Sequence, residues 1–397
     1  MESSTSLEIY FDNNATTQPL LEVREAMLEV LGSGFGNPSS AHSTGDRARE
    51  HLLSAREAVA ALLGVESSRI IFTSGGTESN NLVFANVMNN SSRRLRVVTT
   101  EVEHSSILKY CESLEEHGAE IVYLPVDRDG RLSLSEVEAA ITPNTALVSI
   151  QWVNNETGVI QPVKAISEIC HKQDVQFHTD AAQAVGKVNI DLSALPVDFL
   201  SLSGHKLHGP QGVGALYTRN RKLLSSIIRG GPQEGGLRAG TENLPGIVGI
   251  GKAAELRHER LNQVLDKLRA LRDQFEQQVF EKVPGTEING DRENRACNTT
   301  NILFRDVDGQ ALVARLDMEG IRCSQSSACT NQRPEPSYVL KAMGLSEEEA
   351  YSSVRFSFSE QNSDEEIEYA VTAIEKICKQ LLEFTANRRK LKAAGGA

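Results

Sequence analysis

Short apolar runs alternate with helical patterns through the first two-thirds of the chain. The runs that are typical of buried strands cover residues 69–73, 96–100, 121–125, 146–153, 175–180 and 197–203. Helical patterns cover residues 18–31 and 41–63, and a glycine-containing turn and a further strand follow at residues 209–217. This alternation predicts an α/β architecture with a mostly parallel sheet.

A longer helical pattern begins near residue 253. Apolar side chains recur at helical spacing from there to residue 279, before Pro284 and Gly285. The remaining pattern is shorter and mixed, with strands expected at 302–304, 321–324 and 354–358 and helices at 310–318 and 364–391. The sequence therefore predicts a second, smaller α+β domain after the long helix.

Length and composition support this division and exclude some partners. The 397 residues are too many for one small core, and 40% hydrophobic with 24% charged residues is an ordinary soluble mixture. A net charge of -12, without a basic run interleaved with aromatics, argues against a nucleic-acid partner. No apolar run is long enough to span a bilayer, and the first residues lack a signal-peptide pattern. We therefore expect no membrane partner and a cytoplasmic location.

Two polar motifs follow buried strands in the α/β region. Asp180 is the last residue of the strand of residues 175–180. The second motif is Ser203-Gly204-His205-Lys206, in which Ser203 is the last residue of the strand of residues 197–203. A lysine can form a Schiff base with the aldehyde of pyridoxal phosphate (PLP), and a buried carboxylate can keep the pyridine nitrogen protonated. A surface lysine on a polar turn is the ordinary alternative, but predicted strands flank Lys206 on both sides. The pair Asp180 and Lys206 thus predicts a PLP enzyme.

Further candidate cofactor ligands lie where the chain leaves other strands. Ser74-Gly75-Gly76-Thr77 stands between a strand and a helix, where backbone N–H groups, as at Gly76, and the Thr77 hydroxyl can hold a phosphate. His104 follows the strand of residues 96–100, and its imidazole could stack on the pyridine ring. An ordinary turn and a hydrogen-bonded loop histidine remain the alternatives for these residues.

Asn155 and Arg355 are candidates for binding a substrate. Asn155 follows the strand of residues 146–153, where its amide could reach the phenolate oxygen of the cofactor or a substrate carboxylate. Arg355, on a short strand of the second domain, could bind a carboxylate through two parallel hydrogen bonds. A surface ion pair is the alternative for Arg355.

The six cysteines are scattered without a Cys-x-x-Cys pair, so we expect free thiols and no metal site. Cys329 lies in a run of small polar residues before the prolines at 334 and 336, a pattern that predicts a loop. Free cysteine is usually buried as a small apolar side chain, so a reactive and an inert role for Cys329 both stay open. Cys323, on a predicted strand, is better explained as part of the core.

Together these motifs resemble the cysteine desulfurases of NifS and IscS type, in the class V aminotransferase group of fold-type I PLP enzymes. The matching motifs extend over nearly the whole chain, at residues 12–17, 73–80, 153–158, 180–183, 203–206, 238–243 and 327–330. The resemblance implies a large PLP-binding domain of residues 16–260 with a mostly parallel sheet of seven-stranded type. It also implies a smaller α+β domain, built from residues 1–15 and 261–397, that carries the Cys329 loop.

The resemblance further implies the roles of the site residues. The implied cofactor ligands are Gly76, Thr77, His104, Asn155, Asp180, Gln183, Ser203, His205, Lys206 and Thr241. Among them Gln183 would bind the phenolate oxygen, and Thr241 would reach the phosphate from the partner subunit of a homodimer. Asn155 and Arg355 would bind the substrate carboxylate. The implied catalytic residues are Lys206, His104 and Cys329, the last as the sulfur acceptor.

The function that the resemblance implies is conversion of L-cysteine to L-alanine, which leaves a persulfide on Cys329. An iron–sulfur scaffold or another sulfur-carrier protein would then take up the sulfur. A selenocysteine lyase would use the same residues and is the first alternative. A transaminase of the same fold would not need the thiol of Cys329, and a non-catalytic PLP-binding partner of a sulfur system would need neither Lys206 nor Cys329.

Overall fold

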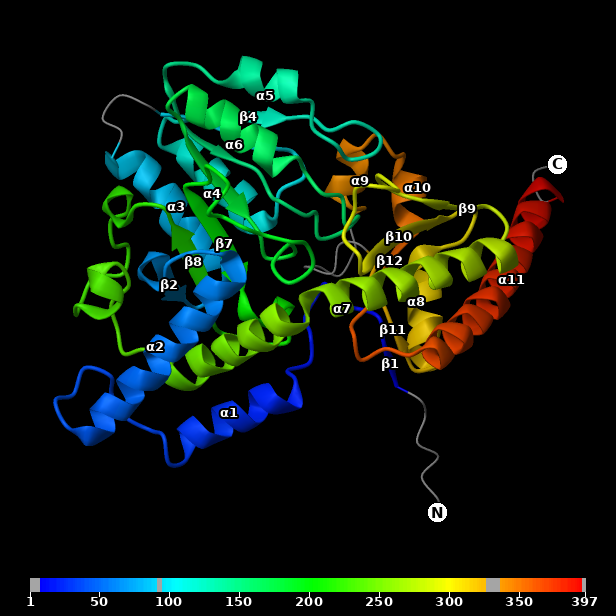
Figure 1. Ribbon diagram of the computed structural model, residues 1–397. Coiled ribbons are helices and arrows are strands. Elements are labelled where there is room, and N and C mark those ends of the chain that lie inside the picture. Colours follow the sequence, from blue (N-terminus) through cyan, green and yellow to red (C-terminus); the bar gives the residue numbers. More distant parts are fainter. Residues whose placement is uncertain (1–7, 91–94, 326–335, 395–397) are drawn as a thin grey trace.

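The computed structural model describes residues 8–90, 95–325 and 336–394, with side chains as far as residues 86 and 384 at two helix ends. Figure 1 shows a larger part around a central sheet, a smaller part beside it, and α7 (Leu244–Lys282) running through both. No helix in the described ranges is long and apolar enough to cross a membrane.

The larger part contains a seven-stranded sheet in the order β2-β8-β7-β6-β5-β3-β4. Its strands are β2 (Ile70–Thr73), β3 (Arg96–Thr100), β4 (Glu120–Leu124), β5 (Thr145–Ser149), β6 (Gln176–Asp180), β7 (Phe199–Ser203) and β8 (Gly214–Thr218). Only β8 runs antiparallel to its neighbours in this sheet. The predicted α/β class with a mostly parallel sheet is confirmed.

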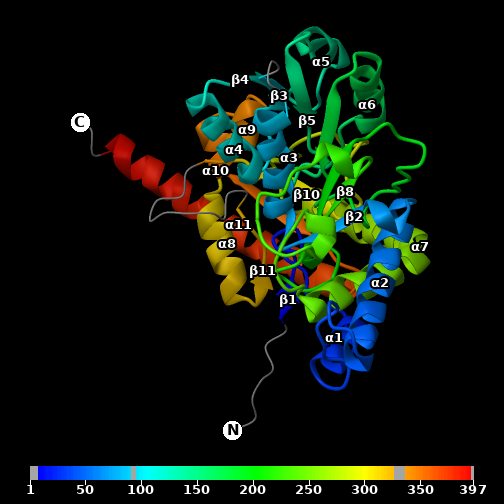
Figure 2. The same ribbon diagram turned by 90° about the vertical axis from the view of Figure 1, so that its left-hand side faces the viewer.

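Helices cover both faces of this sheet, as a buried parallel sheet requires. They are α1 (Leu21–Leu31), α2 (Ser43–Leu63), α3 (Gly76–Asn90), α4 (Ser105–Glu116), α5 (Leu134–Ala140) and α6 (Val163–Lys172), together with the first half of α7. Adjacent strand residues face opposite cores, since Val97 packs in the cluster of α3 and α4 and Val98 in that of α2, α6 and α7. Figure 2 shows α3 and α4 on one side of the sheet and α6 and α7 on the other.

The smaller part is built around the antiparallel sheet β12-β10-β9. Its elements are β9 (Thr286–Ile288), β10 (Thr299–Phe304), α8 (Gly309–Met318), β11 (Ile321–Arg322), α9 (Tyr338–Ala342), α10 (Glu347–Tyr351), β12 (Ser353–Ser357) and α11 (Asp364–Ala394). The N-terminal strand β1 (Ile9–Tyr10) pairs with β11, and Phe11 packs against Phe275 and Phe358. The start of the chain therefore shares the core of its C-terminal part.

The two apolar cores separate near residue 260, between Leu256 in one and Val264 in the other. We propose the two domains with the boundaries predicted from the sequence, 16–260 and 1–15 with 261–397. The helix that joins them starts earlier than expected, at Leu244 instead of about residue 253. Its first turns contain small residues that carry little apolar periodicity. Gly251 allows α7 to lie on α2, because a Cβ there would stand 2.5 Å from Ala55.

A buried histidine connects three neighbouring strands at the centre of the large sheet. His178 on β6 is fully buried, with Nδ1 2.8 Å from the Ser149 hydroxyl of β5 and Nε2 3.0 Å from the Ser201 hydroxyl of β7. Burial lowers the pKa of His178 to about 4. In the unfolded chain the pKa of His178 is near 6.5. Between pH 6.5 and about 4 the unfolded chain therefore binds more protons than the folded chain, and the free energy of unfolding decreases as the pH falls through this range.

We predict that His178→Gln makes the fold less sensitive to acid. From pH 6.5 to 4.5 the variant should lose about 2 kcal/mol less free energy of unfolding than the parent chain, because it has no proton to take up on unfolding. Urea unfolding of the apoprotein at both pH values measures the difference. His117→Gln, at an exposed helix end, is the control and should lose as much as the parent. Equal losses for His178→Gln and the parent would contradict the assignment.

Candidate active site

A cavity of about 330 Å³ opens at the carboxyl ends of β5, β6 and β7, at the junction of the two domains. This is where ligands bind in open α/β sheets. Among its lining residues are ten that the sequence predicted: Gly76, Thr77, His104, Asn155, Asp180, Gln183, Ser203, His205, Lys206 and Arg355. Thr241 is exposed and does not line the cavity of its own chain, and Cys329 lies outside the described residues.

The Asp180 carboxylate is oriented by two hydrogen bonds. Its Oδ2 accepts from Asn80 Nδ2 at 2.8 Å, and its Oδ1 accepts from the backbone N–H of Ala182 at 2.9 Å. The Asn80 amide also donates to the Ser106 hydroxyl at 2.9 Å, so α3 and α4 both help to place the carboxylate. Asn80 belongs to the motif of residues 73–80, but its contact with Asp180, 100 residues later, could not be inferred from the sequence.

Lys206 is held against the N-terminal segment of the chain. It ends the short 3₁₀ turn Gly204–Lys206, which follows β7, and its Nζ donates to the backbone carbonyls of Asn14 and Ala15. Both the carbonyl oxygen of Asn14 and the amine of Lys206 therefore lie at the cavity wall. Lys206, a residue predicted from the sequence, lines the cavity together with Asn14, for which the sequence analysis offered no role.

The opposite end of the cavity is suited to an anion. Helix α3 begins at Gly76, so its first backbone N–H groups and the Thr77 hydroxyl face the same space as Ser203 and His205. Close packing underneath requires glycine, since a Cβ at Gly214 of β8 would stand 2.6 Å from the Cα of Gly75. Burial, with the positive charges of Lys206 and Lys187, lowers the pKa of His205 to about 4, so its ring is neutral near pH 7.

His104 forms the N-cap of α4, and its ring is exposed at the cavity. Its Nδ1 accepts a hydrogen bond from the backbone N–H of Ser106 at 3.1 Å. In the neutral ring this contact leaves the proton on Nε2. The residue before His104 is Glu103, and burial raises the pKa of its carboxyl to about 8. The Thr100 hydroxyl and the backbone N–H of Gln151 donate to this carboxyl and act in the opposite direction.

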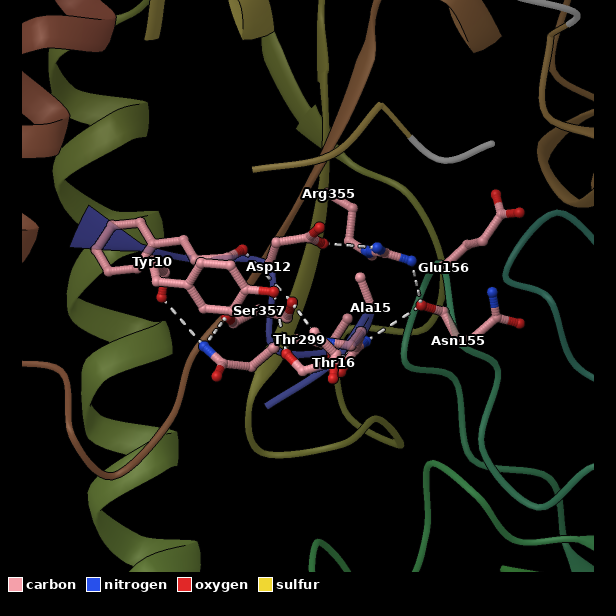
Figure 3. A network of polar contacts seen from close by, with 12 residues as sticks. Tyr10, Asp12, Ala15, Thr16, Asn155, Glu156, Thr299, Arg355 and Ser357 are labelled. Carbon is pink, nitrogen blue, oxygen red and sulfur yellow. Dashed lines mark hydrogen bonds and ion pairs between the residues drawn. The ribbon is translucent and has the colours of Figure 1, made fainter. Parts of the chain in front are cut away.

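Arg355 brings the small domain to the cavity (Figure 3). From β12, it donates to Asp12 Oδ1 at 2.8 Å and to the backbone carbonyl of Asn155 at 3.0 Å. The same carbonyl accepts from Asn14 Nδ2 at 3.1 Å. Arg355 Nε and Asn155 Oδ1 are buried and have no partner within the described parts of the chain. A donor and an acceptor thus stand ready for a polar ligand.

Two residues at the start of α9, its N-cap Ser337 and its first residue Tyr338, also bind the large domain near this site. Ser337 donates to the Glu156 carboxylate, and the Tyr338 hydroxyl donates to the backbone carbonyl of Glu103, the residue before His104. The wall of the cavity is therefore shared by both domains.

These residues fit pyridoxal phosphate. The helix N-terminus with Thr77, Ser203 and neutral His205 suits its phosphate, and the fixed carboxylate of Asp180 suits its pyridine nitrogen. Lys206 has an amine of the kind that can react with its aldehyde. The unpaired Arg355 Nε and Asn155 Oδ1 are left for a second, carboxylate-bearing and amine-bearing molecule.

Comparison with known proteins identifies the class. Residues 9–370 match the family model described as aminotransferase class-V, so the chain belongs to this family. The predicted family is thereby confirmed, and family membership agrees with the cavity in assigning PLP as the cofactor.

Similar proteins with more specific names include the following. A protein from Trichormus azollae named cysteine desulfurase is 43% identical over 373 residues, 94% of this chain and 93% of the relative. A protein from Dictyoglomus turgidum named cysteine desulfurase IscS is 41% identical over 386 residues, 97% and 98% of the two chains. A solved structure entitled NifS-like protein has a TM-score of 0.89 and 37% identity, covering 94% of this chain and 100% of the other.

We predict that Asn80→Leu weakens cofactor binding. The Asp180 carboxylate would lose one of its two orienting donors, which should lower PLP affinity by about tenfold. Absorbance titration of the apoprotein with PLP measures the affinity. Ser106→Ala leaves the contact between Asn80 and Asp180 in place. It removes the other contact of the Asn80 amide and the contact of the Ser106 hydroxyl with His104 Nδ1, and should change the affinity much less. Unchanged affinity in Asn80→Leu would show that this contact does not support the cofactor.

Proposed function

We propose that the chain is a PLP-dependent cysteine desulfurase, which converts L-cysteine to L-alanine and passes the sulfur to an acceptor protein. The observation that carries this proposal is a cavity that places Lys206 and Asp180 beside Arg355, whose Nε is buried and without a described partner. Relatives named cysteine desulfurase, identical at 43% and 41% of aligned positions, support it.

The proposed roles follow from the positions of the side chains. When bound, PLP supplies an electron sink for the charge that develops at the substrate's α-carbon. Arg355 and Asn155 bind the substrate carboxylate and so orient the α-carbon. The Lys206 amine takes up the α-proton as general base, and Asp180 keeps a proton on the pyridine nitrogen. His104, at the mouth of the cavity, stacks on the ring and can donate a proton through Nε2.

The sulfur acceptor that we propose is Cys329. Burial raises the pKa of all five other cysteines, to about 12 for Cys111, Cys170 and Cys378, and also upward for Cys297 and Cys323. Since the thiolate is the nucleophile, these five are poor candidates. The Cys329 thiolate attacks the substrate sulfur, and an S–S bond forms as the Cβ–S bond breaks. The bonding pair passes to Cβ, which takes up a proton and becomes the methyl group of alanine.

We predict that Cys329→Ser binds PLP normally but releases almost no sulfide from L-cysteine in the presence of a reductant. Cys323→Ser is the matched control and should keep near-normal turnover. Mass spectrometry after brief exposure to L-cysteine should find the added sulfur on the peptide that contains Cys329. Sulfur on another cysteine, or full sulfide release by Cys329→Ser, would overturn the assignment. Loss of cysteine turnover with retained selenocysteine turnover would favour a selenocysteine lyase instead.

The proposed enzyme acts as a homodimer that completes each phosphate site with the partner's Thr241. An open hollow of about 490 Å³ lies beside the predicted phosphate ligands and includes Gly76, Thr77 and His205 in its wall. The segment that carries Thr241 is fixed to α3, because Arg238 Nε donates to Glu78 Oε1 at 3.0 Å. Its exposed position suits contact with a second subunit.

We predict that Lys206→Ala and Thr241→Ala are each nearly inactive but regain activity when mixed. After subunit exchange, one of the two sites in a mixed dimer has both Lys206 and Thr241 intact, which limits recovery to about a quarter of the parent activity with random pairing. Sulfide release before and after exchange measures it. Normal turnover by Thr241→Ala alone, or no recovery in confirmed mixed dimers, would exclude the shared site.

The persulfide acceptor that we propose is an iron–sulfur scaffold or another sulfur-carrier protein, within a reducing compartment such as the cytoplasm. A persulfide on Cys329 is a suitable sulfur donor to such a protein, since persulfide transfer is itself an attack by a second thiolate. Co-purification of a persulfide-labelled partner after L-cysteine addition tests this step.

A further inference from the structure

A second lysine, Lys187, is buried directly behind the cavity. Its side chain is only 8% exposed in part because a tight turn folds it back toward Gln183, four residues earlier. Gly186 makes this turn possible with φ at 76°, and a Cβ there would stand 2.2 Å from Leu207 Cδ1. Lys187 does not line the cavity, and the roles proposed above do not use it.

The amine of Lys187 is held by two oxygen acceptors. Its Nζ donates to Gln183 Oε1 at 2.6 Å and to Asn14 Oδ1 at 3.2 Å. Both acceptors are amide oxygens, so the Lys187 amine is the donor in both contacts. Burial lowers the pKa of Lys187 to about 7, and the charges of Lys206, Arg257 and Arg355 act in the same direction, whereas Cys297 opposes them.

This contact determines which way the Gln183 amide is turned. The Lys187 amine donates to Gln183 at 2.6 Å, so it is the amide oxygen of Gln183 that faces it. The NH₂ group then points the other way, where Nε2 donates to the backbone carbonyl of Asn14 at 2.9 Å. That carbonyl also accepts from Lys206, and Gln183 itself lines the cavity. The NH₂ group of Gln183 thus lies on the side of Lys206, since both donate to the same carbonyl.

We propose that Lys187 is a positioning residue that locks the Gln183 amide with its NH₂ group toward the phenolate oxygen of PLP. The inference rests on the proposed cofactor contact of Gln183 and extends it by one residue. Without Lys187, the amide could rotate and present its oxygen to the phenolate. The phenolate would then lose a donor and hold the proton it shares with the Lys206 nitrogen more tightly.

The test is a pH titration of the visible absorbance of the PLP-loaded protein, which needs no substrate. In Lys187→Met, an apolar side chain of similar length, the midpoint should move up by about one pH unit, the effect of losing one hydrogen bond. Gln183→Met should move it similarly. The double variant should move it no further than Gln183→Met alone, because Lys187 acts through Gln183.

Two further variants separate this role from others. Gln183→Glu keeps an acceptor for Lys187 but removes the NH₂ group, so it should also raise the midpoint, and it tests the geometry even if Lys187→Met does not fold. Asn298→Ala removes the other side-chain donor to Asn14 Oδ1, at 3.1 Å, and should leave the midpoint unchanged.

The results that overturn the proposal are distinct. An unchanged midpoint in folded Lys187→Met, with only a lower melting temperature, would make Lys187 structural. If the shifts of the midpoint in Lys187→Met and Gln183→Met add up in the double variant, the charge of Lys187 acts directly on the cofactor. An equal shift in Asn298→Ala would assign the effect to Asn14. Failure of the parent chain to bind PLP at all would instead refute the proposed function.

Discussion

The path of residues 12–17 between the two domains is the constraint on which the site depends. Backbone carbonyls of Asn14 and Ala15 accept the Lys206 amine, and the Asn14 side chain joins Lys187 to the carbonyl of Asn155. Asp12 holds Arg355 from the other domain. Carbonyl oxygens have fixed directions once the backbone is fixed, so this segment can orient an amine and an amide without long side chains of its own.

The segment stays in place because apolar packing anchors it on one side. Phe11 packs edge-on against Phe275 and Phe358, with ring centroids 6.0 and 4.9 Å apart, inside the core of the small domain. Asn13 donates to the backbone carbonyl of Ser357 at 2.9 Å, which continues the contact along β12. The hydrophobic core of one domain therefore positions polar groups that act in the cavity of the other.

The sequence predicts the parts of this site that follow directly from strand ends. Asp180 and Lys206 were recognisable because each follows an apolar run, and parallel strands bring their carboxyl ends to one edge. Asn14, Asn80 and Lys187 were not, because their roles depend on partners distant along the chain or on a turn at Gly186. The early part of α7 was missed for a different reason. Pro245 and the glycines at 246, 249 and 251 are typical of turns and obscure the helical spacing of the buried Leu244, Ile247 and Ile250.

The pairing of residues 9–14 with β11 and β12 has a consequence for the order in which the structure forms. Residues 9–14 are made first, yet their partners are β11 and β12, at Ile321–Arg322 and Ser353–Ser357. During synthesis the large sheet can form before residues 9–14 have their partners. The wall of the cavity around Lys206 is complete only after some 340 further residues have been synthesised. The cofactor cavity is thus among the later features to form, and loading with the cofactor reports that synthesis has passed β12.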